Sequence, residues 1–147
     1  NDGTKIYIEM KNKHNTMNSS SSQKTYMRML NKIANDSTAE CYLVEAIAKT
    51  SQNIVWKVSV DGERVENEKI RRVSLDKFYE IVTGDKEAFY KMCMELPKII
   101  DEIIEEHKEL QVGSDTVIDE LKEKNPDLLK ALYLLAFKEY EGFENLK

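Results

Sequence analysis

The chain begins with an alternation of apolar and polar residues that predicts a β-strand. Over residues 5–13, Ile6, Ile8 and Met10 alternate with polar or charged residues, and this period of two is typical of a half-buried strand. Successive side chains of a strand point to opposite faces of the sheet. We therefore expect the three apolar residues to anchor one face in a core, and the charged residues to share the other.

The next two segments predict a helix and a second strand. From residue 23 to residue 33 apolar residues recur at helical spacing, with Ser21 or Ser22 as the N-cap. Residues 41–48 are short, apolar and partly β-branched, which favours a buried strand, although their Glu and Ala residues also suit a helix. If they form a strand, it lies parallel to the first and is joined to it by a right-handed crossover.

Two Asp-Gly dipeptides mark tight turns. The dipeptide at 61–62 separates residues 54–60 from residues 64–73, and this pattern predicts a β-hairpin. The dipeptide at 2–3 stands directly before the first strand. It predicts a further strand ahead of the sequence, in which case the N-terminal part of the core is missing.

The second half of the chain predicts helices alone. Capping and stop signals divide it into successive helices, and these signals are Ser74, Gly84, Asp85, Ser114 and Pro126. We expect one domain over residues 1–147, with a strand-rich half (1–74) that faces its ligand and an acidic helical half (75–147).

The two halves differ in charge. The net charge is −5, but residues 1–74 carry 12 Lys and Arg against 9 Asp and Glu, whereas residues 75–147 carry 10 against 18. Binding to a phosphate backbone requires a locally positive surface, not a basic protein. A nucleic acid would therefore lie against the first half, although charge asymmetry also serves helix solubility.

Other features bear on location. The sequence has no run of eighteen apolar residues and no signal-like start, so we expect neither a membrane span nor an export segment. Cys41 and Cys93 lie in apolar segments without metal-ligand spacing. Buried, reduced thiols are consistent with a cytoplasmic protein.

The candidate chemistry lies on the charged face of the first strand. Glu9 and Lys11 are one strand repeat apart, which suits a site where the carboxylate holds a hard divalent cation and the amine stands over the water that the cation activates. The same spacing fits a solvated strand face with an ion pair, which is commoner.

The string Ile-Glu-Met-Lys-Asn-Lys-His-Asn-Thr-Met-Asn-Ser-Ser-Ser at residues 8–21 resembles a group of type II restriction endonucleases of the PD-(D/E)xK superfamily. That group cuts DNA at GGNCC or a narrower form such as GGWCC. Further matching strings lie at 42–45, 51–54, 71–79, 83–85 and 132–137, so the resemblance spans nearly the whole chain.

The resemblance implies a restriction-endonuclease-like α/β core, a mixed sheet with a crossover helix, to which a β-hairpin and a C-terminal helical bundle are added. It also implies Mg²⁺-dependent hydrolysis of double-stranded DNA at a short palindrome. A homodimer and a cognate DNA methyltransferase would accompany that activity.

In such a site, Glu9, the backbone carbonyl of Met10 and an aspartate hold Mg²⁺, while Lys11 orients or deprotonates the attacking water. Asp2 is the one acid upstream of Glu9, but it falls where a turn is expected. The aspartate is either Asp2 or a residue upstream of residue 1, and a chain without it would be inactive.

Two polar segments supply candidate DNA contacts. The loop predicted from residue 12 to residue 22 is rich in amides and hydroxyls that bond phosphates and base edges, and arginine on the hairpin can pair with guanine. The candidates are Lys13, His14, Asn15, Asn18, Ser19, Gln52, Asn53, Arg71 and Arg72. Alternatively, the segment is an ordinary Asn/Ser loop, and the two arginines pair with acids or touch phosphates only.

Two other functions remain open. One is a structure-selective or repair nuclease that has the same site without base readout. The other is a non-catalytic DNA-binding or inhibitor module, which the absence of the aspartate would favour. In a digest of mixed-sequence DNA with Mg²⁺, the structure-selective nuclease would cut without a fixed sequence. The non-catalytic module would bind DNA in EDTA and would not cleave it with Mg²⁺.

Overall fold

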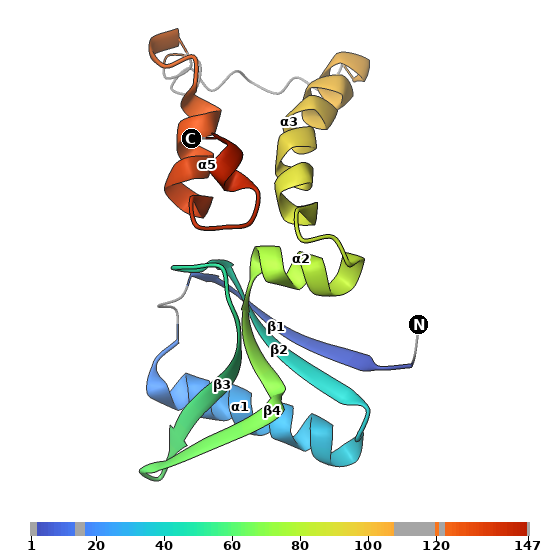
Figure 1. Cartoon of the computed structure of the whole chain (residues 1–147), viewed down its shortest axis with the longest axis vertical. Coiled ribbons are helices and arrows are strands. Elements are labelled where there is room, and N and C mark those ends of the chain that lie inside the picture. Colours follow the sequence, from blue (N-terminus) through green and yellow to red (C-terminus); the bar gives the residue numbers. More distant parts are fainter. Residues whose placement is uncertain (1–2, 14–16, 108–119, 121–122, 147) are drawn as a thin grey trace.

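The computed structural model describes residues 3–13, 17–107, 120 and 123–146. They form a four-stranded mixed sheet in the order β1-β2-β4-β3, with helices packed on it and beyond one of its ends (Figure 1). The strands are β1 (Lys5–Lys13), β2 (Ala39–Ile47), β3 (Asn53–Val60) and β4 (Glu63–Ser74). The predicted mixed α/β architecture is therefore confirmed.

The crossover and the hairpin both form as predicted. Helix α1 (Ser19–Asn35) connects β1 to β2, and the two strands pair in parallel. Strands β3 and β4 pair antiparallel, and both residues of the turn between them have positive φ, 51° at Asp61 and 86° at Gly62. Such angles are what a tight hairpin turn requires. Strand β4 also pairs in parallel with β2 and joins the hairpin to the crossover unit.

Helix α1 begins earlier than predicted. Its N-cap is Asn18, whose Oδ1 accepts a hydrogen bond from the backbone N–H of Ser21 at 2.8 Å. The predicted caps, Ser21 and Ser22, lie inside the first turns, so the loop predicted up to residue 22 was too long. A run of four serines is typical of a loop, but the strong N-cap ahead of it places the serines in the helix.

The prediction for the apolar residues of β1 was wrong. Ile6, Ile8 and Met10 are 39%, 48% and 54% exposed, whereas Tyr7, on the opposite face, packs against the core. The reason is the placement of α1, which covers the face of Tyr7 and forms the core with Tyr26 and the buried residues of the sheet. The alternation shows that the two faces differ, but not which face a helix covers.

Helix α2 (Leu75–Thr83) packs on the other face of the sheet, over Tyr42, Val44 and Val73. Because these residues belong to β2 and β4, the apolar side of β1 stays uncovered within the described residues. The helix ends at Gly84 in the left-handed conformation, φ 76°, as predicted.

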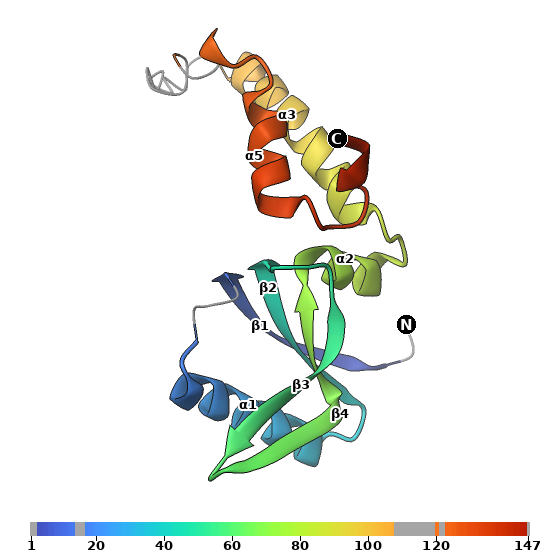
Figure 2. The ribbon, with the colours of Figure 1, turned by 60° about the vertical axis from the view of Figure 1, so that its left-hand side comes forward.

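Two helices stand side by side beyond the α2 end of the sheet (Figures 1 and 2). They are α3 (Ala88–Glu106), which runs through Pro97, and α5 (Leu128–Phe137), which is followed by η1 (Phe143–Leu146). Asp85, the predicted cap of α3, lies instead in the preceding turn, where its Oδ1 accepts from the N–H of Glu87 at 2.9 Å. The helix predicted to begin at Ser114 lies outside the described residues.

The helical half is attached to the sheet by buried polar contacts. The hydroxyl of Tyr140 accepts from the N–H of Ala48 at 2.8 Å and donates to the carbonyl of Ala46 at 2.9 Å. Asp76, which is fully buried, accepts from the hydroxyl of Ser51 at 2.6 Å and from the N–H of Glu141 at 3.1 Å. These bonds fix the end of β2 and the loop that follows it.

The two cysteines are buried and free, as predicted. Burial raises the pKa of the Cys93 thiol to about 11 and also raises the pKa of Cys41, so both carry their proton at neutral pH. None of the helices that the structure describes combines the length and the apolar character that a bilayer crossing needs.

Candidate active site

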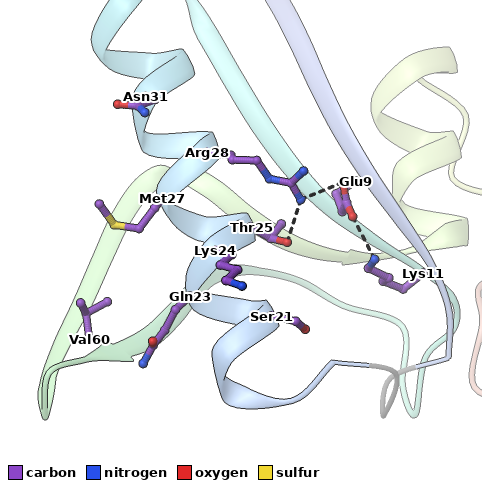
Figure 3. Close-up of a pocket in the computed structure, with 10 residues that line it drawn as sticks. All are labelled: Glu9, Lys11, Ser21, Gln23, Lys24, Thr25, Met27, Arg28, Asn31 and Val60. Atoms are coloured by element: carbon purple, nitrogen blue, oxygen red, sulfur yellow. Dashed lines mark hydrogen bonds and ion pairs between the residues drawn. The ribbon is translucent and has the colours of Figure 1, made fainter.

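An open pocket of about 740 Å³ lies between β1 and α1 (Figure 3). Strand β1 contributes Glu9 and Lys11, and α1 contributes a row of polar residues that faces them: Ser21, Lys24, Thr25 and Arg28. The row recurs at spacings of three and four residues, so its members lie on one face of the helix. The crossover helix therefore forms one wall of the pocket, and the edge strand forms the other.

The sequence-predicted pair is brought together in this pocket. The Nζ of Lys11 lies 2.9 Å from Oε1 of Glu9, and both side chains are about one-third exposed. Two residues on one face of a strand are neighbours, so the pairing follows directly from their spacing. An ion pair this exposed contributes little to stability. Its side chains are therefore available for chemistry instead of being committed to holding the fold.

The structure adds a second cation that the sequence analysis missed. The Nη2 of Arg28 lies 3.8 Å from Oε2 of Glu9 and donates to the hydroxyl of Thr25 at 3.2 Å. One oxygen of Glu9 thus faces an amine, and the other faces a guanidinium. The helical spacing of Lys24 and Arg28, combined with the predicted crossover, was the signal that could have found it.

The pocket wall is locally positive although the chain is acidic. Lys11, Lys24 and Arg28 line it together with a single carboxylate, Glu9. Clefts lined by one sign of charge concentrate the opposite sign, so the pocket favours an anion such as a phosphodiester. This agrees with the prediction that a nucleic acid lies against the first half of the chain.

Among the described residues that line this pocket, Glu9 is the one carboxylate. No group of three or more His, Cys, Asp or Glu side chains suited to a metal occurs among the described residues, and Asp2 lies outside them. Mg²⁺ is bound in many sites by one or two carboxylates plus substrate phosphates and water. The hard oxygens of Glu9 fit such an ion, with the remaining ligands coming from elsewhere.

Next to the pair, a buried carboxylate links β2 to the hairpin. Glu45 stands in register with Lys11 across the β1–β2 pairing and is 2% exposed. It accepts from Nη2 of Arg72 at 2.6 Å and from Nε2 of Gln52 at 3.3 Å. Lys11, Glu45 and Arg72 line a second, smaller pocket of about 80 Å³. Arg72 thus pairs with an acid, which is one of the alternatives that the sequence left open for this residue.

The other candidate DNA contacts do not line the first pocket, although Lys13 lines the second, and some lie outside the described residues. Arg71 is held by Asn53, with its Nε 2.6 Å from the side-chain Oδ1 and its Nη2 2.9 Å from the backbone carbonyl. Asn18 caps α1, Ser19 is the first residue of that helix, and Lys13 ends β1. His14 and Asn15 lie outside the described residues.

Comparison with known proteins identifies the class to which this fold and site belong. The chain is 30% identical over 112 residues to the type II restriction enzyme Sau96I of Staphylococcus aureus, an alignment that covers 71% of this chain and 43% of that enzyme. The resemblance to type II restriction endonucleases is thereby confirmed.

The particular family follows from a second comparison. The family model of the Eco47II restriction endonuclease matches residues 1–105, and the chain therefore belongs to the Eco47II restriction endonuclease family. It spans less than half of the length of the curated relative that it matches. No solved structure matches the chain.

Proposed function

We propose that the protein is a Mg²⁺-dependent type II restriction endonuclease, which hydrolyses double-stranded DNA at a short palindromic site of the GGNCC type. The observation that carries the proposal is the Glu9–Lys11 pair, which opens on a positively lined pocket in a member of a restriction endonuclease family. The group named in the sequence analysis supplies the expected site, and PD-(D/E)xK is the motif to which the pair corresponds.

The metal would be held by Glu9, the backbone carbonyl of Met10 and an aspartate outside the described residues, either Asp2 or one upstream of residue 1. When bound, Mg²⁺ supplies a Lewis acid that polarises the phosphodiester and makes water a stronger nucleophile. Glu9 suits this role because its carboxylate lines the pocket and is about one-third exposed.

Lys11 positions the attacking water and stabilises the transition state. Its Nζ, 2.9 Å from Glu9, holds the oxygen of a water beside the carboxylate and offsets the negative charge that develops on the phosphate. In hydrolysis the water oxygen bonds to phosphorus, and the bond from phosphorus to the leaving sugar oxygen breaks. The water loses one proton to solvent, and the leaving oxygen gains one from solvent.

DNA contact divides between two sets of residues. Lys24 and Arg28 lie in the pocket wall next to the reacting phosphate, and the candidates near the ends of β1 and α1 (Lys13, His14, Asn15, Asn18 and Ser19) extend this contact along the backbone or into a groove. Arg71, Arg72, Gln52 and Asn53 are the hairpin-side candidates for base readout. For Arg72 and Gln52, readout requires release of the buried Glu45 carboxylate, which is costly.

Cutting both strands of a palindrome calls for a twofold homodimer. The acidic helices are the proposed interface, since α3 and α5 carry exposed apolar residues; examples are Ile99, Ile103, Leu132 and Leu135, the last 82% exposed. Sedimentation velocity on the full-length protein, alone and with its DNA site, tests the dimer. Host DNA that carries the same site would need protection by a cognate methyltransferase.

The test is a digest of mixed-sequence plasmid DNA by the full-length protein with Mg²⁺, followed by sequencing of the fragment ends. We expect ends at one GGNCC-type sequence, no cleavage by Lys11→Ala, and DNA binding by that variant close to wild type. Ends without a common sequence indicate the structure-selective nuclease instead. Binding in EDTA with no cleavage in Mg²⁺ indicates the non-catalytic module, and cleavage by Lys11→Ala removes Lys11 from the mechanism.

A further inference from the structure

Arg28 occupies the position beside Glu9 that a divalent cation would also approach. Its guanidinium stands at Oε2 of the carboxylate, while Lys11 takes Oε1 (Figure 3). The 3.8 Å separation is that of an ion pair and is too long for a hydrogen bond. The guanidinium is therefore attracted to the carboxylate but not locked to it.

The side chain of Arg28 is built to move between two partners. It is 68% exposed, so it can move away from Glu9 by a change of rotamer that leaves helix α1 intact. Its other contact is the hydroxyl of Thr25, which is 4% exposed and fixed within α1. A guanidinium carries several N–H donors in a planar fork that matches phosphate oxygens, so it can keep the Thr25 contact and take up a new acceptor.

The charges in the pocket decide when Arg28 leaves Glu9 for another acceptor. A dication at Glu9, next to both Lys11 and Arg28, would crowd like charges around one carboxylate, and this repulsion opposes cation binding in the free protein. A phosphodiester that enters the pocket brings a negative charge to the same place. Arg28 then has an anionic acceptor within the pocket and no longer competes for Glu9.

We propose that Arg28 is a further catalytic residue, which holds Glu9 in the free protein and transfers to a non-bridging oxygen of the scissile phosphate when DNA binds. This inference rests on the proposed nuclease function and deepens it. Arg28 delays cation binding until substrate is present and then stabilises the charge that develops on the phosphate. Lys32, one turn further along α1, differs, since its amine lies over the ring of Tyr7, 5.0 Å from the ring centroid.

The experiment compares Arg28→Gln, Arg28→Lys and Lys32→Gln in the full-length protein. Lys32→Gln is the matched control because it removes one positive charge from the same helix, one turn away, without touching Glu9. Mn²⁺ affinity is measured by calorimetry without DNA, and the single-turnover cleavage rate is measured with Mg²⁺ at saturating DNA. Circular dichroism confirms that each variant is folded.

We expect Arg28→Gln to bind Mn²⁺ about three- to tenfold more tightly than the wild type in the absence of DNA, since the Arg28 guanidinium no longer competes with the metal for Glu9. Its cleavage rate should fall on the order of a hundredfold, the usual loss when one charge-stabilising donor is removed. Arg28→Lys keeps the positive charge but loses the planar guanidinium, and we expect its cleavage rate to lie between those of the wild type and Arg28→Gln. Lys32→Gln should stay within about twofold of wild type in both measurements.

Arg28→Gln results that match those of Lys32→Gln in both measurements overturn the inference but leave the nuclease proposal intact, because the wild type still cuts. Weaker Mn²⁺ binding by Arg28→Gln also overturns it, since Arg28 would then support the metal site instead of competing with it. A folded wild type that cuts no DNA with Mg²⁺ refutes the proposed function and this inference together.

Discussion

The buried Glu45–Arg72 pair yields a prediction that separates two roles of Arg72. The sequence leaves open whether Arg72 reads bases, pairs with an acid or touches phosphates, and the structure shows its guanidinium 2.6 Å from a carboxylate that is itself 2% exposed. If the pair mainly supports the fold, Arg72→Met leaves Glu45 as a buried charge that keeps, among the described side-chain hydrogen bonds, the one from the Gln52 amide at 3.3 Å. If Arg72 reads bases, the same change affects DNA binding instead.

The expected loss of stability follows from the burial of each partner. Removing one partner of a buried ion pair costs about 3–5 kcal/mol, and the lower end applies here because the Arg72 side chain is 32% exposed to solvent. Adding Glu45→Gln to Arg72→Met removes the stranded charge, so the double variant should lose only about 1–2 kcal/mol. The second substitution should therefore restore stability to the first.

Urea unfolding followed by circular dichroism measures both variants. With a slope of about 1.5 kcal/mol per molar urea, Arg72→Met should lower the midpoint by about 2 M, and the double variant by about 1 M. If Arg72→Met instead unfolds within about 0.5 kcal/mol of wild type and loses affinity for one DNA sequence only, the argument from burial is refuted and Arg72 is a base-reading residue.

Other positions give independent tests. Asn18→Ala removes the cap of α1 and should cost about 1 kcal/mol in urea unfolding, with Ser19→Ala as the neutral comparison. Gly142→Ala should cost about 2–3 kcal/mol, because φ is +90° and the new Cβ would lie 2.8 Å from Tyr90; wild-type stability would disprove the clash. Hydrogen bonds from Lys5 and Thr38 lower the pKa of Asp36 from 3.8 to about 2. Because the folded pKa is the lower one, this carboxylate stabilises the fold above about pH 4, and the gain is lost as the pH falls toward 2. An NMR titration checks the value, and Lys5→Gln should return it toward 3.8.

Local chemistry predicted much of the fold. Asp61-Gly62 located the hairpin because those residues tolerate the positive φ of a tight turn, and the apolar segment that became β2 was long enough for one buried strand. The first strand shows the limit of this reasoning. The alternation of Ile6, Ile8 and Met10 gave the strand, but its buried side depends on where α1 packs, which is information from elsewhere in the chain.

The candidate site was predictable only along one strand. Glu9 and Lys11 meet because they are two residues apart on one strand, so their spacing in the sequence is enough to predict the contact. Arg28 reaches Glu9 from a different element, through the packing of α1 on β1, and Gln52 and Arg72 meet at Glu45 in a similar way. Such contacts depend on tertiary structure, which a pattern along the sequence does not encode.

The contact of Tyr140 with β2 has a consequence for how the protein is made. Its hydroxyl bonds a backbone N–H that lies 92 residues earlier in the chain, so the end of β2 cannot complete its hydrogen bonding until the last helices have left the ribosome. The C-terminal end of β2, the strand that carries Glu45, therefore lacks this bond while the helical half is being synthesised. A ribosome that stalls before residue 140 would hold a nascent chain whose sheet has formed but whose backbone N–H at Ala48, just after β2, lacks this hydrogen bond.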